Sequence, residues 1–141
     1  MQFITGGTFN GKSKWVRENN DSSKEWIKLF DADSMPQHDD HEGTVVIEGL
    51  EYLVLSLLRT GRDSDSLRKA FITSFQQWKS WEDDSSNEVI WIGSDISKGI
   101  VPMNAEDRLW RDMTGWIYQD LVKHSDRVYE IWFGLPTILK G

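Results

Sequence analysis

The sequence predicts an α/β fold in which a mainly parallel sheet is flanked by helices. Short β-branched or apolar stretches alternate with helical stretches along the chain, which is the order of β-α-β units. Two strand-like stretches, 44–47 and 88–93, are mostly apolar, as expected of parallel strands that are buried on both faces. A glycine-rich turn at 6–13 lies between a strand-like and a helix-like stretch. These three observations together predict the fold class.

The first half of the chain begins with a short apolar stretch at 2–5, which is the expected first strand. Residues 12–18 contain no Pro or Gly and can open a helix. Alternating apolar and polar residues predict a strand at 25–30. The next segment, 31–43, is rich in acid, Pro and His and is expected to be a loop. The β-branched run at 44–47 predicts a buried strand.

In the second half, residues 50–59 are apolar and predict a helix. An apolar stripe at helical spacing predicts a helix at 64–81, with Asp63 or Ser64 as its N-cap. A strand is expected at 88–93 and a long helix at 105–124. The chain then ends with expected strands at 126–133 and 137–140.

Composition limits the class of protein. A length of 141 residues suits one domain, so we expect residues 1–141 to form a single unit. A hydrophobic content of 38%, with eight Trp, is enough for a core. The absence of Cys excludes a disulfide framework and Cys-based metal sites. A net charge of −7 argues against broad nucleic-acid binding, which needs a basic face.

The hydropathy pattern argues against a membrane protein. No run of 18 apolar residues occurs, so no membrane span is expected. The expected first strand begins at residue 2, which leaves no room for a signal peptide. We therefore expect a cytoplasmic protein.

The turn at 6–13 matches G-x-x-x-x-G-K-S, the pattern of a loop that binds nucleoside triphosphates such as GTP or ATP; a chance match is the alternative. Its backbone N–H groups would form a nest around the phosphates, and the following helix would add its positive end. Lys12 would reach the β- and γ-phosphates, and the Ser13 hydroxyl would ligate Mg²⁺. The expected phosphate-binding residues are Gly6, Gly7, Thr8, Phe9, Asn10, Gly11, Lys12 and Ser13.

Two other segments are expected near this loop, because ligands of parallel sheets bind beyond the carboxyl ends of the strands. Glu48 ends one strand and is a second candidate ligand for Mg²⁺; a carboxylate capping the next helix is the alternative. Glu51, three residues on, is a weaker candidate for the same role and is expected to be solvated. Residues 94–102 follow another strand. There, Asp95 and Ser94 could face the phosphates or an acceptor and Lys98 could touch phosphate, unless the segment is an ordinary connection.

Other polar groups are expected on the surface. Arg108 and Asp112 have i, i+4 spacing and can pair with each other. His38 and His41 have a metal-like spacing, but their acid-rich loop favours a solvated segment. Six Trp lie in expected regular elements, where burial in a core or an interface is the default. They are Trp15, Trp78, Trp81, Trp110, Trp116 and Trp132.

Taken in order, five segments resemble the adenosylcobinamide kinase / adenosylcobinamide-phosphate guanylyltransferase family, and the Gly-Ile-Val-Pro and Arg-Asp patterns within them are the specific part. The segments are 5–13, 46–50, 98–104, 108–115 and 127–140. The resemblance implies a three-layer, RecA-like fold and often a trimer. It also implies an enzyme of cobalamin biosynthesis that phosphorylates a hydroxyl of adenosylcobinamide with ATP or GTP and then transfers GMP through a guanylylated His.

The chain departs from that family in the interval between its first helix and the Trp-containing strand. The family has a further strand and a helix there, and the helix carries the nucleophilic His. Here Trp26 follows Lys12 by only 14 positions, and no His lies between them. We therefore expect guanylyl transfer to be lost and do not assign it to His38 or His41. The segment Ser94-Asp95-Ile96-Ser97 also differs from the Asn-Glu-Val-Gly usual in the family.

Two hypotheses follow from the sequence. The first is a kinase-like enzyme in which Lys12 stabilises charge, Ser13 and Glu48 hold Mg²⁺, and Asp95 orients the acceptor hydroxyl. The second is a non-catalytic nucleotide-binding relative that acts as a regulator or subunit.

Overall fold

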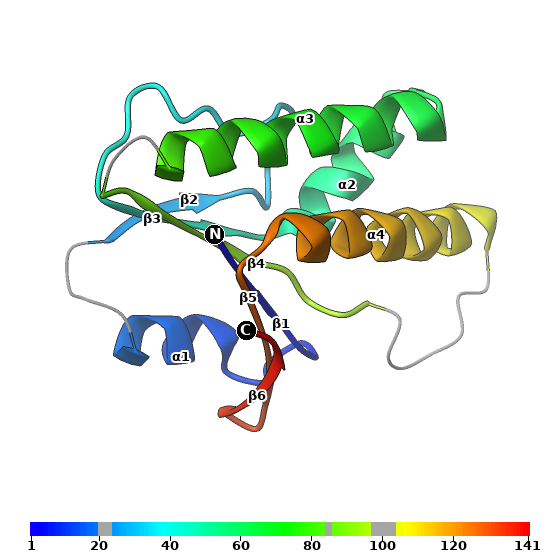
Figure 1. Cartoon of the computed structure of the whole chain (residues 1–141). Helices are drawn as coiled ribbons and strands as arrows, with labels where there is room; N and C mark the ends of the chain where they lie inside the picture. Colours follow the sequence, from blue (N-terminus) through cyan, green and yellow to red (C-terminus); the bar gives the residue numbers. More distant parts are fainter. Residues whose placement is uncertain (20–23, 84–85, 97–103) are drawn as a thin grey trace.

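The computed structural model describes residues 1–19, 24–83, 86–96 and 104–141 (Figure 1). Within these ranges the chain forms one six-stranded sheet with the strand order β2-β3-β4-β1-β5-β6. Five strands are parallel, and β6 alone runs antiparallel, paired with β5. The strands are β1 (Gln2–Thr5), β2 (Lys24–Lys28), β3 (Thr44–Glu48), β4 (Glu88–Ile92), β5 (Arg127–Trp132) and β6 (Leu135–Lys140).

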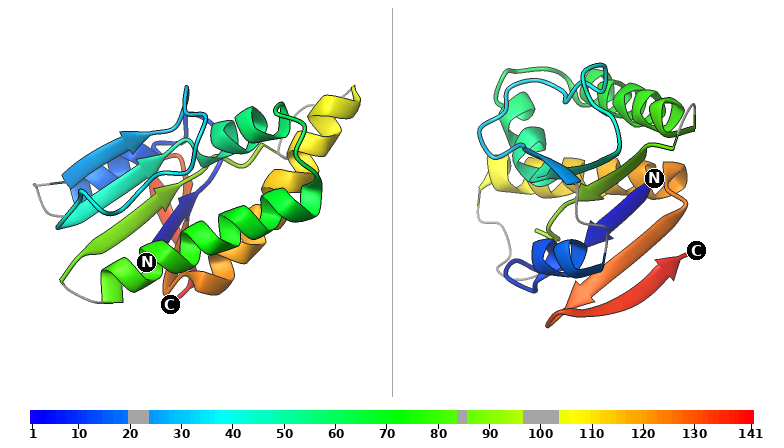
Figure 2. Two further views of the ribbon diagram at one scale, coloured as in Figure 1. Left: turned by 90° about the horizontal axis from the view of Figure 1, so that it is seen from above. Right: turned by 90° about the vertical axis from the view of Figure 1, so that its left-hand side faces the viewer.

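Helices cover both faces of the sheet, which gives the three layers expected from the sequence. Figures 1 and 2 show α2, α3 and α4 on one face and α1 on the other. The helices are α1 (Lys12–Asn19), α2 (Leu50–Leu58), α3 (Ser64–Asp83) and α4 (Ala105–His124). The predicted α/β class with a mainly parallel sheet is therefore confirmed.

The alternation of side chains along the strands divides the core into two clusters. Val45 and Ile47 of β3 face the three-helix side, where α3 contributes Phe75 and Trp78, both buried. Val46, between them, faces α1 with other buried residues. Full burial of an apolar side chain such as Val46, Ile47 or Phe75 stabilises the fold by about 1.5–3 kcal/mol. Both faces of the central strands are therefore fixed by packing.

The start of α3 and two edge strands show how the predicted bounds compare with the structure. Asp63 caps α3, since its Oδ1 accepts a hydrogen bond of 2.9 Å from the Ser66 N–H. The second strand ends at Lys28 rather than at residue 30. The final strand begins at Leu135 rather than at residue 137. A tight turn with positive φ at Phe133 and Gly134 lets β6 pair with β5 from its first residue.

Two of the six Trp that were expected in a core or an interface do not lie in the core of the chain. Trp116 on α4 is 43% exposed and Trp132 at the end of β5 is 46% exposed. Helical and strand periodicity do not reveal that a Trp lies on the outer face of its element, which is the position of both.

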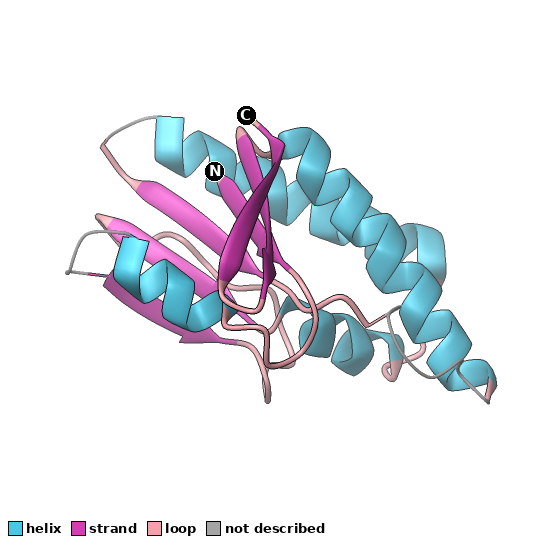
Figure 3. Ribbon diagram, turned by 90° about the horizontal axis from the view of Figure 1, so that it is seen from below, coloured by secondary structure: helices cyan, strands magenta, loops and turns pink. Residues whose placement is uncertain are grey.

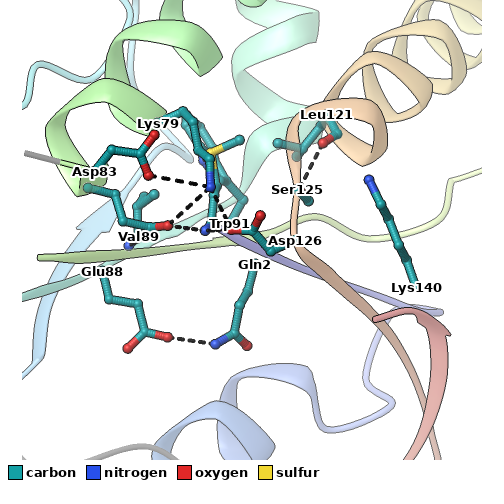
Figure 4. Close-up of polar contacts among 12 residues, drawn as sticks. Gln2, Lys79, Asp83, Glu88, Val89, Trp91, Leu121, Ser125, Asp126 and Lys140 are labelled. Carbon is teal, nitrogen blue, oxygen red and sulfur yellow. Dashed lines mark hydrogen bonds and ion pairs between the residues drawn. The ribbon is translucent and has the colours of Figure 1, made fainter.

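An ion-pair network joins α3 to the amino ends of β1 and β5. Lys79 Nζ donates to Asp126 Oδ2 over 2.6 Å, and the Met1 ammonium donates to the same oxygen over 2.8 Å (Figure 4). Glu82 also pairs with the Met1 ammonium. These contacts lie at the edge of the sheet opposite the glycine-rich turn. Among the described residues, no helix is long and apolar enough to cross a membrane.

Candidate functional site

The parallel pairing aligns the carboxyl ends of β1, β3 and β4 at one edge of the sheet. Figure 3 shows the loops that follow the strands gathered along this edge. The glycine-rich turn after β1, Glu48 at the end of β3 and Ser94 after β4 therefore meet, as predicted from the strand order of parallel sheets.

The glycine-rich turn leads directly from β1 into α1. Lys12 is the first residue of the helix, and its Nζ donates a 2.8 Å hydrogen bond back to the Gly7 carbonyl. The Trp15 N–H bonds to the Gly11 carbonyl over 2.9 Å, which continues the helical pattern into the turn. The turn thus wraps around the Lys12 ammonium at the positive end of a helix, where an anion is favoured.

Close contact with β5 explains why the turn begins with Gly6. Gly6 has a φ of +140°, and a Cβ at this position would lie 2.3 Å from the Ile131 carbonyl oxygen. Any larger residue would have to displace backbone atoms of β5. Glycine is therefore required at position 6, and the pairing of β1 with β5 holds the turn in place.

Ser13 and Glu48 are brought together from positions 35 apart in the chain. The Ser13 hydroxyl donates a 2.6 Å hydrogen bond to Glu48 Oε2. Glu48 does not cap the following helix, because the N-cap of α2 is Gly49 and no side chain makes a cap hydrogen bond there. The structure therefore places both candidate magnesium ligands side by side. Hydroxyl and carboxylate oxygens are the donors that Mg²⁺ prefers.

Lys12 lies between two carboxylates in a partly dry environment. Its side chain is only 8% exposed. Burial lowers the Lys12 pKa, while the negative charges of Glu51 and Glu48 act in the opposite direction. Burial disfavours the charged form of an amine, and the two acids favour it. The pair therefore opposes the effect of burial on the Lys12 pKa.

Glu51 is buried, and the expectation that it is solvated is wrong. It is 4% exposed, and its Oε2 accepts a hydrogen bond of 3.2 Å from the Ser94 N–H. Its Oε1 is buried without a hydrogen-bond partner. Burial raises the Glu51 pKa, while hydrogen bonds and Lys12 oppose the rise. A sequence signal existed, because Glu51 is the one charged residue in a helix whose other residues are otherwise apolar or neutral.

A cavity of about 470 Å³ opens between the glycine-rich turn and the first turn of α2. Its charged and polar lining includes Lys12, Ser13 and both acids. Phe30 and Tyr52 form an aromatic wall, with ring centroids 5.3 Å apart. The remaining lining residues are Thr8, Phe9, Gly11, Lys14, Gly49, Ile92 and Ser94. The cavity therefore combines two lysines, two acids and an aromatic wall.

Asp95 lies beside a different cavity. Its N–H donates a 2.8 Å hydrogen bond to the Gly6 carbonyl, so its backbone supports the turn. Its side chain lines a cavity of about 450 Å³ with Thr5, Tyr118 and Lys123, on the α4 side of β1. The buried Tyr118 hydroxyl donates to the Ser94 carbonyl over 2.7 Å, and burial raises the Tyr118 pKa well above its usual value. Lys98 and the segment 99–102 lie outside the described residues.

At the start of α4, the Trp110 Nε1 donates a 2.8 Å hydrogen bond to the Glu51 carbonyl and so supports α2 from outside the cavity. Asp112 forms an ion pair of 3.2 Å with Arg111. This is the neighbouring residue, rather than Arg108 at the expected i, i+4 spacing.

All three histidines lie far from the cavity. The His41 ring is 2.8 Å from a Glu25 carboxylate oxygen and packs near Trp78 with His38, so both are partly buried rather than solvated. His124 contacts Phe75 at the end of α4. These positions are at the amino ends of the strands. The length of β3, which has five residues, places about 15 Å between these amino ends and the glycine-rich turn.

The strand order and the glycine-rich turn define an α/β protein of the P-loop type. A family model described as cobinamide kinase / cobinamide phosphate guanyltransferase matches residues 24–139. The chain belongs to this family, whose members bind nucleotides and act on cobinamide substrates in cobalamin biosynthesis. The match begins after the glycine-rich turn and includes Glu48 and Glu51. No curated protein matched the chain.

Proposed function

We propose that this chain is a kinase that binds GTP or ATP with Mg²⁺ at residues 6–13 and transfers the γ-phosphoryl group to a hydroxyl of adenosylcobinamide. One observation carries the proposal: the turn with the complete G-x-x-x-x-G-K-S pattern brings Lys12 and Ser13 to the edge of the sheet where Glu48 lies, and Ser13 bonds to Glu48 there. Membership in the family supports the substrate class.

The roles follow from the contacts. The backbone N–H groups of the turn would bind the phosphates, and Lys12 would offset the charge on the transferring group. Ser13 and Glu48 would hold Mg²⁺, which supplies charge neutralisation between the phosphates when bound. No group of three or more potential metal ligands occurs among the described residues. Two protein oxygens nevertheless suit Mg²⁺, because it takes most of its ligands from phosphates and water.

The acceptor would enter the cavity beside Glu51. In the transfer, the acceptor hydroxyl oxygen bonds to the γ-phosphorus, the bond to the bridging β–γ oxygen breaks, and the hydroxyl proton leaves to a base or water. Glu51 lines this cavity and has an unpartnered oxygen, so it can orient that hydroxyl. We retain Asp95 as a second orienting candidate, because its backbone is tied to Gly6.

We do not propose guanylyl transfer. That step requires a nucleophilic His at the nucleotide. The three histidines of the chain are at the opposite edge of the sheet, and two of them contact Trp78 there. Incubation with guanine-labelled GTP should leave no acid-labile label on the protein, and a labelled His38 or His41 would contradict this.

Transfer of label from γ-labelled GTP to cobinamide tests the kinase proposal. We expect labelled cobinamide with the wild-type chain, a loss of at least 100-fold with Lys12→Ala because the charge beside the phosphates is removed, and no loss with Lys69→Ala. Lys69 is an exposed residue of α3, which covers the face of the sheet opposite α1. Tight calorimetric binding of GTP without transfer would instead favour a non-catalytic regulator or subunit.

We also propose a homo-oligomer, which the family resemblance suggests. Light scattering of the purified chain would measure its mass. A mass of 16.4 kDa, that of one chain, would contradict this proposal.

A further inference from the structure

The turn between β5 and β6 contacts the glycine-rich turn directly. The Gly134 N–H donates a 2.9 Å hydrogen bond to the Asn10 carbonyl, and the Phe133 N–H donates to Asn10 Oδ1 over 3.4 Å. A Cβ on Gly11 would lie 3.4 Å from the Gly134 Cα. The hairpin turn is therefore held directly against the glycine-rich turn.

Two aromatic side chains at this turn are held in the open. Phe133 is 76% exposed, Trp132 is 46% exposed, and their rings meet edge to face with centroids 5.2 Å apart. Exposed apolar residues occur singly on most proteins, but here two rings are adjacent, and Trp132 lies near Gly7 of the glycine-rich turn.

The backbone of Phe133 is strained. Its φ is +50°, a left-handed conformation that costs a bulky residue about 1 kcal/mol or more. Gly or Asn would occupy that position with less strain. Because the exposed ring gains little by burial, packing within the fold does not explain a Phe at this position, and a ligand contact would explain it.

The strand order indicates which part of a nucleotide lies there. In the sheet, β4 lies next to β1 on one side, followed by β3, which ends at Glu48. On the other side of β1 lie β5 and its hairpin. A triphosphate with its terminal phosphate beside Lys12 and Glu48, extended across the turn and away from β3, would have its nucleoside end toward the β5–β6 turn.

We infer that Trp132 and Phe133 form a stacking platform for the nucleobase of the bound nucleotide. This inference rests on the proposed nucleotide site. An aromatic face stacks on any base with little selectivity, so the platform accepts both guanine and adenine and leaves discrimination to other groups. Phe9, which is also exposed, lines the cavity beside Lys12 and is not included in the platform.

Calorimetric titration with GTP, ATP and inorganic tripolyphosphate, each with Mg²⁺, tests the inference. Stacking contributes to the two nucleotides but not to tripolyphosphate. We expect Phe133→Ala to lower the affinity for both nucleotides by about tenfold, within the range of one lost base-stacking contact. The affinity for tripolyphosphate should stay unchanged. Ile138→Ala removes an exposed apolar side chain farther along the same hairpin and should change neither.

A second variant separates the platform from hairpin stability. Phe133→Gly removes the ring and relieves the positive φ, so it should be at least as stable as the wild type and still bind nucleotides about tenfold more weakly. Nucleotide affinity equal to that of the wild type in both variants would overturn the inference. An equal loss of tripolyphosphate affinity would also overturn it, because the side chain would then act through the phosphate turn.

Fluorescence provides an independent readout. The Trp132 emission should fall when GTP binds and stay constant with tripolyphosphate, and subtraction of a Trp132→Phe variant isolates this signal from the other seven Trp. A wild-type chain that binds neither GTP nor tripolyphosphate would refute the proposed function itself. A chain that binds both with equal affinity would refute only the platform.

Discussion

The Ser13 hydroxyl donates a 2.6 Å hydrogen bond to the Glu48 carboxylate, and this contact joins the start of α1 to the end of β3. Because both oxygens are suitable for Mg²⁺, Glu48→Gln should weaken the magnesium dependence of GTP binding. We expect the gain in GTP affinity on adding Mg²⁺ to fall by about tenfold, within the range for a lost metal-site partner. Glu42→Gln, in the exposed loop before β3, is the control. An unchanged magnesium effect in Glu48→Gln would exclude Glu48 from the metal site.

The buried pair of Lys12 and Glu51 predicts a pH effect. Lys12 must be protonated to attract phosphate, so GTP affinity declines as the pH rises through the Lys12 pKa. The Glu51 charge raises that pKa. Glu51→Gln removes the charge, so the decline should begin at a lower pH than in the wild type. Titration calorimetry at several pH values from about 7 to 10 would measure the shift, and a shift to higher pH would contradict the electrostatic assignment.

Contact between Gly6 and Ile131 predicts a stability effect. A Cβ at Gly6 would overlap the Ile131 carbonyl oxygen, so Gly6→Ala should lower the free energy of unfolding by about 2–4 kcal/mol. The matched control is Gly61→Ala. That residue has a φ of +84°, but a Cβ added to it would meet no atom within 4 Å, so its cost should be only about 1 kcal/mol. Urea unfolding would measure both, and equal costs would contradict the overlap.

Asp126 predicts a stability change in acid. The Lys79 hydrogen bond and the Met1 ammonium lower the Asp126 pKa to about 2 from 3.8. A lowered pKa stabilises the fold above pH 3.8, and this contribution is lost as the pH falls toward 2. Because the side chain is 60% exposed, screening limits the contribution to about 1 kcal/mol or less.

Asp126→Asn should therefore be slightly less stable than the wild type at neutral pH. The difference in unfolding free energy should shrink as the pH falls from about 4 to 2. A difference that grows in acid would show that the ion pair is not its source.

Much of the fold follows from local sequence signals. The β-branched run of β3 and the apolar stripe of α3 fix the type of each element, and Asp63 fixes where α3 begins. The carboxyl-edge rule then brings Ser13 and Glu48 together, although they are far apart in the chain. The meeting of the glycine-rich turn with Glu48 could therefore be predicted.

The burial of Glu51 and the position of Asp95 could not be predicted in the same way. Both depend on how α2 and α4 are rotated against the sheet, which local patterns do not determine. The exposure of Trp132 depends on a hairpin whose tightness comes from the positive φ of Phe133. Tertiary packing, rather than local propensity, decides these features.

The mass of cobinamide after incubation with GTP, Mg²⁺ and the purified chain tests the central claim most directly. We predict the gain of one phosphoryl group, with one GDP formed for each product, and no gain with Lys12→Ala. Tight GTP binding without any change in the mass of cobinamide would contradict the kinase assignment, and the gain of a GMP group would contradict the loss of guanylyl transfer.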